Sequence, residues 1–214
     1  MIPAICVVGK SNEGKTTLLE GLIPELKRRG YRIAVVKHTD KEVELDTPGK
    51  DSWRLSRAGS DAVVLSTPGK VVIFRAEVES SISEIQRFTG LDFDLFIIEG
   101  YKQARLPKIE VRRGHRSGSS EILSDLIAIV SDQPLSESVP VFTFGDTKGL
   151  VDLIEKRFFA GGGSEVNLYV NRKNISLNPF VRKLIASTVA GMVSVLKVVK
   201  DKINEVTIWV KLVK

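Results

Sequence analysis

The sequence predicts an α/β fold in which a mostly parallel sheet is flanked by helices, followed by a small C-terminal α+β extension. Two observations carry this prediction. Short apolar segments rich in valine and isoleucine alternate with helical patterns over residues 1–160, as expected of strands buried between two layers of helices. The first segment, Ala4–Val8, leads directly into a glycine-containing loop and then into an amphipathic helical pattern from Thr16 to about Arg29.

Each predicted strand is short, apolar or β-branched, and bounded by residues that favour turns. In chain order the strands are Ala4–Val8, Arg32–His38, Asp61–Ser66, Val71–Ala76, Asp94–Glu99, Lys108–Arg112, Leu126–Ser131 and Val139–Phe144. Thr67–Lys70 predicts a tight turn, so the strands on either side of it form a local antiparallel pair at one side of the sheet. Further helices are predicted over Ser83–Phe88 and Lys148–Phe158.

The glycine run Gly161–Gly163 is the predicted domain boundary, because consecutive glycines form a flexible joint. We expect a main domain over residues 1–160 and a small α+β extension over residues 164–214. The extension is predicted to contain a hairpin, a long helix with a proline at its first position, and a last strand. Their ranges are Glu165–Val170 with Ile175–Leu177, Pro179 onward after the cap residue Asn178, and Val206–Val210.

The loop after the first strand carries the most specific motif in the chain. Its residues match the pattern G-x-x-x-x-G-K-[ST] of phosphate-binding loops. Backbone N–H groups in such a loop, together with the N-terminus of the next helix, favour a bound anion. The residues predicted to hold phosphates are Gly9, Lys10, Ser11, Asn12, Glu13, Gly14, Lys15, Thr16 and Thr17. The motif predicts a P-loop NTPase sheet that binds a nucleoside triphosphate.

Three residues have more specific expected roles. Lys15 is the candidate catalytic lysine, which places a positive charge at the β- and γ-phosphates, and the Thr16 hydroxyl is a predicted ligand for Mg²⁺. Glu99 closes an apolar strand at the carboxyl edge of the sheet, where another Mg²⁺ ligand is expected. These residues predict a metal-assisted phosphate site.

Asp132 and Asp146 each follow a later strand, at the same edge of the predicted sheet. A carboxylate at this position can accept the N1 and N2 protons of guanine, which makes Asp132 a candidate nucleotide-binding residue. The alternative is that both residues form turns or helix caps, which aspartate favours. The chain contains no N-K-x-D motif, so the residues leave the choice between guanine and adenine open.

Composition limits the class of protein. The chain has 214 residues and a formal net charge of +6, with scattered positive residues and an aromatic content of 7%. Without an aromatic stacking cluster, this pattern favours a basic pocket for phosphate-bearing small molecules over nucleic-acid binding. No apolar run approaches the ~18 residues that span a bilayer. No segment has the pattern of a signal peptide, and the single Cys6 fits a reducing compartment, so we expect a cytoplasmic protein without a membrane partner.

Four segments together resemble the molybdopterin-guanine dinucleotide biosynthesis protein B (MobB) family. They are the phosphate loop, Lys37–Leu65, Asp94–Lys102 and Pro107–Val111. The resemblance runs from about Ile5 to Phe158. Its most distinctive block, which ordinary P-loop proteins lack, is Asp46-x-x-Gly49-Lys50-Asp51-Ser52-x-Arg54.

The resemblance implies a GTP-binding adapter with weak GTPase activity that assists the guanylylation of molybdopterin. It implies GTP and Mg²⁺ as cofactors, a molybdopterin guanylyltransferase as partner protein, a molybdopterin-type ligand, and a homodimer. It also supports Glu99 as a metal ligand, since a Glu-Gly pair after a strand commonly serves Mg²⁺ in this branch of P-loop proteins.

The block from Asp46 to Arg54 supplies the remaining candidate residues. From position alone, Asp51 or Asp46 is the candidate for orienting the attacking water. Lys50 and Arg54 are the candidates for neutralising either the γ-phosphate or the phosphate of a pterin ligand. We expect slow turnover, because no glutamine or arginine finger is identifiable in the sequence.

Two alternative functions stay open at this point. A P-loop small-molecule kinase would need a lid rich in arginine, for which Arg112, Arg113 and Arg116 are available. A nucleotide-gated docking module would use the nucleotide only to shape a surface for a partner, without significant hydrolysis.

Overall fold

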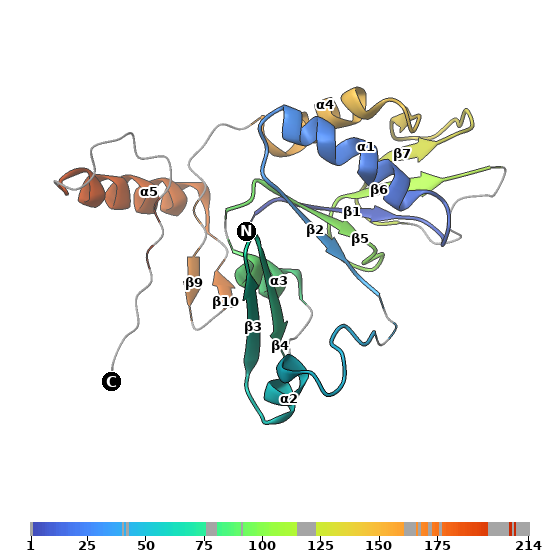
Figure 1. Ribbon diagram of the computed structural model, residues 1–214. Helices are drawn as coiled ribbons and strands as arrows, with labels where there is room; N and C mark the ends of the chain where they lie inside the picture. The colour runs from blue at the N-terminus through green and yellow to red at the C-terminus, as the bar shows by residue number, and fades with distance from the viewer. Residues whose placement is uncertain are drawn as a thin grey trace. The chain divides into compact units, whose positions relative to one another are not determined.

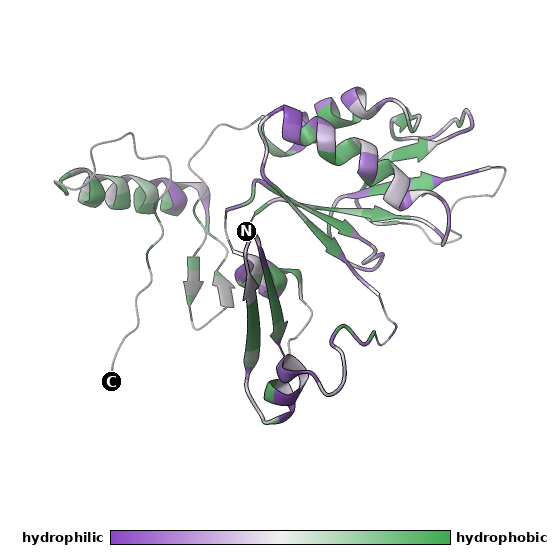
Figure 2. Cartoon of the chain, viewed as in Figure 1, coloured by the Kyte–Doolittle hydropathy of each residue, from purple (hydrophilic) through white to green (hydrophobic). Residues whose placement is uncertain are grey.

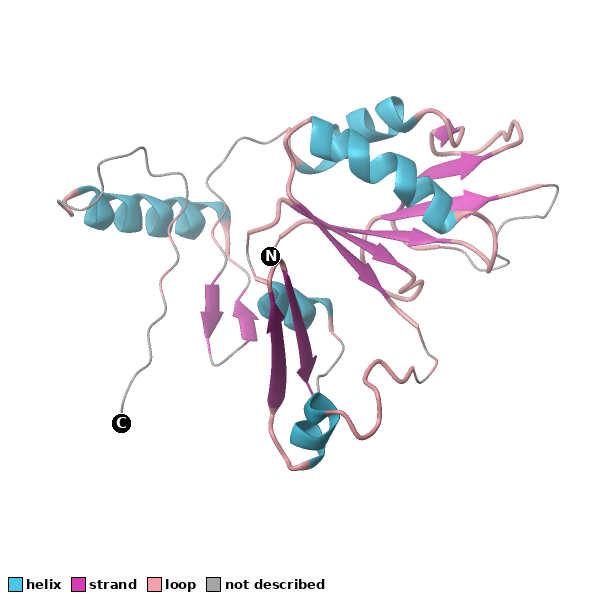
Figure 3. Cartoon of the chain, in the orientation of Figure 1, coloured by secondary structure: helices cyan, strands magenta, loops and turns pink. Residues whose placement is uncertain are grey.

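The computed structural model describes residues 2–39, 41, 43–75, 81–90, 92–114, 123–160, 166, 168–170, 173–175, 177–196, 206 and 208. The chain separates into two compact units, Ile2–Glu155 and Lys156–Lys214. Figures 1 and 3 show the helices and strands within them. In chain order the elements are β1 (Ala4–Val8), α1 (Lys15–Arg28), β2 (Ile33–Lys37), α2 (Asp51–Arg57), β3 (Ala62–Thr67), β4 (Lys70–Arg75), α3 (Ile82–Thr89), β5 (Leu95–Glu99), β6 (Lys108–Arg112), β7 (Leu126–Ser131), β8 (Val141–Phe142), α4 (Thr147–Phe158), β9 (Leu168–Val170), β10 (Lys173–Ile175) and α5 (Pro179–Ser194).

Six strands form one sheet in the order β2-β5-β1-β6-β7-β8, and every neighbouring pair in it is parallel. This confirms the predicted parallel sheet. In the register of the sheet, Val7 of β1 lies opposite Glu99 of β5 on one side and Ile109 of β6 on the other. The ends of β5 and β6 therefore flank the loop that follows β1, at the edge where parallel sheets bind ligands.

The central strands are buried on both faces, as their continuous apolar sequence predicts. All of β1 is buried, and the apolar residues of β5 have no exposed surface. Figure 2 shows both strands in the colour of hydrophobic residues. On one face, Cys6 and its neighbours pack against Ile82 and Ile85 of α3. The buried apolar residues of α1 and α4 do not belong to the group around Cys6. They lie on the opposite face of the sheet, where Figure 1 shows the two helices together.

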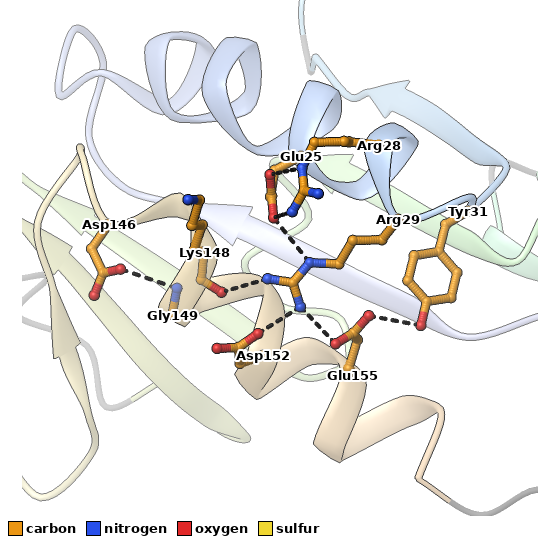
Figure 4. Close-up of polar contacts among 9 residues, drawn as sticks. All are labelled: Glu25, Arg28, Arg29, Tyr31, Asp146, Lys148, Gly149, Asp152 and Glu155. Carbon is orange, nitrogen blue, oxygen red and sulfur yellow. Dashed lines mark hydrogen bonds and ion pairs between the residues drawn. The ribbon is translucent and has the colours of Figure 1, made fainter.

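Arg29, directly after α1, ties this helix to α4 (Figure 4). Its guanidinium donates to Asp152 Oδ1 at 2.5 Å, to Glu155 Oε2 at 2.6 Å and to Glu25 Oε1 at 3.0 Å. The Tyr31 hydroxyl donates to the other oxygen of Glu155 at 3.0 Å. The Arg29 side chain is only 17% exposed, so water screens these ion pairs less than it screens pairs at an open surface. The C-terminal end of α1 is thereby anchored, while its N-terminal end carries the phosphate-loop motif.

The structure differs from the sequence prediction in three places. A helix, α2, forms over Asp51–Arg57, a segment for which the sequence predicts neither helix nor strand, and none of its residues is buried. β3 and β4 pair antiparallel as predicted but form a two-stranded sheet of their own. β8 is limited to Val141–Phe142 and pairs only with β7, at the edge of the sheet.

The second unit contains the predicted hairpin and long helix. β9 and β10 pair antiparallel. Asn178 caps α5 as predicted, because its Oδ1 accepts a hydrogen bond from the Val181 N–H at 2.9 Å. The predicted boundary Gly161–Gly163 lies outside the described residues, as does the predicted last strand apart from Val206 and Ile208. Among the helices that the structure describes, none has the length and apolar character needed to cross a membrane.

Candidate phosphate-binding site

The loop between β1 and α1 has the backbone geometry of an anion-binding loop. Gly9, Asn12 and Gly14 have φ values of +150°, +64° and +94°. Positive φ values at intervals let the chain curl into a concave loop lined by N–H groups. A Cβ on Gly9 would lie 2.6 Å from the carbonyl oxygen of Val111, so only glycine lets the loop begin this close to β6.

Gly14 is also the N-cap residue of α1 and offers no side chain as a cap. The first N–H groups of a helix have no acceptor within the helix, and the helix dipole adds partial positive charge there. Ser11, Asn12, Thr16 and Thr17 are exposed around this end of α1. The loop and the helix terminus therefore form one electropositive concavity.

Two side chains brace the loop from within. Glu13 is only 7% exposed, and its Oε2 accepts a hydrogen bond from the Lys10 N–H at 2.7 Å. The Lys15 ammonium donates to the carbonyl oxygens of Gly9 at 3.1 Å and of Lys10 at 2.7 Å. Glu13 thus accepts a hydrogen bond from the Lys10 N–H, a group that the sequence predicts to bind phosphate. Lys15 lies over the loop, where its charge attracts an anion.

Glu99, at the end of β5, meets the loop on one side. The Thr16 hydroxyl donates to Glu99 Oε2 at 3.4 Å. Hydroxyl and carboxylate oxygens are both ligands that Mg²⁺ accepts. The part of the chain that the structure describes contains no group of three or more His, Cys, Asp or Glu residues that could hold a metal ion.

Aromatic residues border Glu99 at the carboxyl ends of β2 and β5. The rings of His38 and Tyr101 lie 3.9 Å apart between centroids. Tyr101 has a φ of +55°, an uncommon value for a bulky residue that is found mostly where the surroundings enforce it. Gly100 separates Glu99 from Tyr101 in the chain, and a Cβ on Gly100 would lie 3.4 Å from His38 Cβ.

The two aspartates that follow β7 and β8 make backbone hydrogen bonds. Asp132 Oδ1 accepts from the Gly114 N–H at 2.8 Å, which links the loop after β7 to the loop after β6. Asp146 Oδ1 accepts from the Gly149 N–H at 3.0 Å, at the start of α4. Asp146 therefore caps the start of α4, which is one of the two roles that the sequence allows for it. Asp132 follows β7, which pairs with β6, the strand beside the phosphate loop.

Phe144 and Arg113 contact the phosphate loop on the side away from Glu99. The Arg113 guanidinium carbon lies 4.7 Å from the centroid of the Phe144 ring. A Cβ on Gly14 would meet the Phe144 ring at 3.0 Å and an Arg113 nitrogen at 3.2 Å, so both groups touch the loop at Gly14. Phe144 was predicted only as the end of a strand, because no local pattern indicates a contact between the loops after β6 and β8.

The arginine lid expected of a small-molecule kinase is not assembled by the described residues. Arg112 donates to Glu110 Oε2 at 3.0 and 2.7 Å and forms a further ion pair with Glu137. The positive charge of Arg112 is therefore already neutralised by Glu110 and Glu137. Arg116 lies outside the described residues.

The block that contains Asp46, Lys50, Asp51 and Arg54 is organised locally. Asp46 Oδ1 accepts from the Thr47 N–H at 2.8 Å and from the Ser52 hydroxyl at 2.9 Å. Lys50 is the N-cap residue of α2, and the Asp51 and Arg54 side chains form a loose, exposed ion pair at 3.8 Å. These contacts stay within the segment, so they do not join its charged residues to the phosphate loop.

A parallel sheet whose first strand turns through a glycine loop into a helix places the chain among the P-loop nucleotide-binding proteins. Within that class it belongs to the MobB family. The family model described as "Molybdopterin guanine dinucleotide synthesis protein B" matches residues 4–132. This confirms the resemblance that the motifs indicate.

Relatives and solved structures agree with this assignment. The chain is 34% identical over 161 residues to the molybdopterin-guanine dinucleotide biosynthesis adapter protein of Escherichia coli (strain K12), covering 72% of this chain and 92% of the relative. It is 31% identical to the putative adapter protein of Methanocaldococcus jannaschii, over 90% of this chain and 91% of the relative, so that match includes part of the second unit. The crystal structure of Bacillus subtilis MobB has a TM-score of 0.57 and 26% identity, covering 75% of this chain and all of that one.

Proposed function

We propose that this protein is a GTP-binding adapter with weak GTPase activity that assists the guanylylation of molybdopterin. The observation that carries the proposal is the loop, in which Gly14 opens α1 at a φ of +94° and the Lys15 ammonium lies 2.7 Å from Lys10 O. This geometry favours a polyphosphate ligand. Relatives named as molybdopterin-guanine dinucleotide biosynthesis adapter proteins support a role in molybdenum-cofactor biosynthesis.

Thr16 and Glu99 would hold Mg²⁺ beside the phosphates. Their oxygens lie 3.4 Å apart and belong to the hard donors that this ion prefers. Mg²⁺ usually keeps water and phosphate oxygens in its shell, so two protein ligands are sufficient. When bound, the ion neutralises charge on the phosphates, while Lys15 supplies a second positive charge from the loop.

Hydrolysis is proposed to be slow. Of the two candidates for orienting water, Asp51 is the better one, because its side chain is 96% exposed at the start of α2. Asp46 is engaged by Thr47 and Ser52 and stabilises the turn into that helix. Neither residue is held against the loop by a contact among the described residues, and an unpositioned base contributes little to the rate.

The segment around α2 is proposed to serve the partner protein and its pterin substrate. Arg54 is 72% exposed, and Lys50 lies directly before the helix. Both are suited to the phosphate of a molybdopterin-type ligand held between this adapter and a molybdopterin guanylyltransferase. The reduced, buried thiol of Cys6 fits a cytoplasmic location for this complex.

A homodimer is proposed to form through the β3–β4 hairpin. Val64, Val71 and Ile73 share one face of this two-stranded sheet and are 59%, 60% and 55% exposed. Among the described residues, each strand of the hairpin pairs only with the other strand, and exposed apolar edges favour pairing with another chain. The double variant Val64→Lys/Ile73→Lys should be monomeric by light scattering if a second copy covers this face.

The main proposal is tested by calorimetric titration of the full chain with GTP and ATP in the presence of Mg²⁺. GTP should bind, and Lys15→Ala should abolish binding, whereas Arg157→Ala removes an exposed positive charge from α4 and should have no effect. Next, molybdopterin guanylylation by the purified partner should be stimulated by the wild-type protein and not by Lys15→Ala. Stimulation that persists in Lys15→Ala would contradict a nucleotide-dependent adapter.

A further inference from the structure

The contacts of the phosphate loop give a bound triphosphate a direction. Thr16 and Glu99 mark the metal side, and Glu99 lies on β5. Thr16 and Glu99 would hold Mg²⁺, which would neutralise charge on the terminal phosphates, so the terminal phosphate would lie on this side of β1. The nucleoside end of the ligand then lies on the opposite side, toward β6, β7 and β8. The groups that meet the loop there are candidates for reading the base.

Arg113 lies at that end of the loop, over the Phe144 ring and close to Gly14. Its guanidinium carbon lies 4.7 Å from the Phe144 ring centroid, and one of its nitrogens would be 3.2 Å from a Cβ on Gly14. A guanidinium over an aromatic ring gains cation–π attraction, which restrains a side chain that is otherwise exposed. Arg113 is therefore a positioned cation and donor beside the loop.

Asp132 lies next to Arg113 through the backbone. Its Oδ1 accepts from the N–H of Gly114, the residue that follows Arg113, at 2.8 Å. This bond uses one carboxylate oxygen, and a carboxylate has up to four acceptor positions on its two oxygens. The loop after β6 thus carries Arg113, and the loop after β7 carries a carboxylate that is hydrogen-bonded to the residue following Arg113.

A neighbouring guanidinium and carboxylate complement guanine and oppose adenine. Arginine donates to the O6 and N7 acceptors of guanine, and a carboxylate accepts from its N1–H and N2–H₂ groups. Adenine presents an amino donor to the arginine and the N1 acceptor to the carboxylate. We infer that Arg113, supported by Phe144, and Asp132 form the pair that selects guanine, an inference that rests on the proposed binding of GTP.

The pair is tested by calorimetric titration of the full chain, with Mg²⁺, using GTP, ATP, xanthosine triphosphate and inorganic tripolyphosphate. Wild type should prefer GTP to ATP by at least about tenfold, the discrimination expected of one good base contact. Arg113→Ala should remove most of this preference and leave tripolyphosphate affinity within about twofold. Arg157→Ala is the control for loss of one positive charge.

Asp132→Asn keeps an oxygen for the Gly114 N–H and replaces the other oxygen with an amide donor. Xanthine has a carbonyl where guanine has the N2 amino group, so this variant should lose GTP affinity and gain affinity for xanthosine triphosphate. Phe144→Leu should weaken the GTP preference without unfolding the protein, because the side chain is only half-buried. Circular dichroism melting confirms that each variant is folded.

The outcomes separate this inference from the proposed function. A Lys15-dependent GTP site whose GTP preference is unchanged in Arg113→Ala and Asp132→Asn would overturn the base-reading pair alone. Equal losses of GTP and tripolyphosphate in Arg113→Ala would assign Arg113 to the phosphates and overturn it as well. Absence of binding of every triphosphate would overturn both the proposed function and the inference.

Discussion

The Thr16 hydroxyl donates to Glu99 Oε2 at 3.4 Å, although 83 residues separate the two in the chain. The parallel pairing of β1 with β5 produces this contact, because it sets Val7 opposite Glu99 and leaves the phosphate loop directly beyond. The strand pairing thus brings together the two proposed ligands for Mg²⁺, one on the helix and the other on the neighbouring strand.

The first prediction concerns this pair. Glu99→Gln removes the negative charge and should lower GTP affinity in Mg²⁺ by at least about tenfold, as loss of a metal-site group does. In EDTA Glu99→Gln should bind GTP at least as tightly as the wild type, because without the metal the carboxylate only repels the phosphates. Parallel titrations in the two buffers measure the difference. Glu20→Gln, an exposed substitution on α1, is the matched control.

The second prediction concerns Gly14. An alanine there would place its Cβ 3.0 Å from the Phe144 ring and 3.2 Å from Arg113, at a φ of +94°. GTP affinity should fall by about 5- to 150-fold, because crowding of this kind costs about 1–3 kcal/mol. Gly30 has the same φ of +94°, and a Cβ there would have no atom within 4 Å. Gly30→Ala should therefore lower the melting temperature and leave GTP affinity unchanged, and equal affinities in the two variants would contradict the steric account.

The third prediction concerns the thiol of Cys6. Burial raises the pKa of this thiol from 9.0 to about 11, and the side chain has no exposed surface. The thiolate is the reactive form, so the folded protein should resist alkylation near pH 8 and react only when denatured. Since the pKa is raised in the folded state, stability should also fall as the pH rises from 9.0 toward 11, where the unfolded chain ionises first. Rapid labelling of the native protein would show that β1 opens.

Much of the fold was predictable because the central strands are continuous apolar runs. β1, β6 and β7 have the bounds that the sequence predicts, residue for residue. α2 was missed because all of its residues remain at least partly exposed, which leaves no apolar periodicity to detect. β8 pairs with β7 over only two residues, and this pairing depends on strand order, which local sequence does not reveal.

Within the candidate site, the motif specified the loop but not its neighbours. Contacts such as that between Arg113 and Phe144 join loops after different strands, so they depend on strand order rather than on local pattern. Lys108 shows the same limit in the core. It is fully buried, and its ammonium donates to the carbonyl oxygens of Ala104, Leu106 and Ser124, whereas a lysine in a sequence is ordinarily expected at the surface.

The last prediction concerns stability in acid. Hydrogen bonds from Arg28 and Arg29 lower the pKa of Glu25 from 4.5 to about 2 in the folded protein. The unfolded chain therefore takes up a proton first as the pH falls, so stability conferred by this carboxylate is complete above about 4.5 and is lost as the pH falls toward 2.

Glu25→Gln cannot be protonated in this range, and it also removes one of the three carboxylate partners of Arg29, the residue that joins α1 to α4. The variant should be less stable than wild type at neutral pH, and the difference between them should shrink as the pH falls through this window. Urea denaturation of both proteins across that range measures it, with Glu20→Gln as the control on the same helix. A difference that stays constant with pH would show that Glu25 acts through packing and not through its charge.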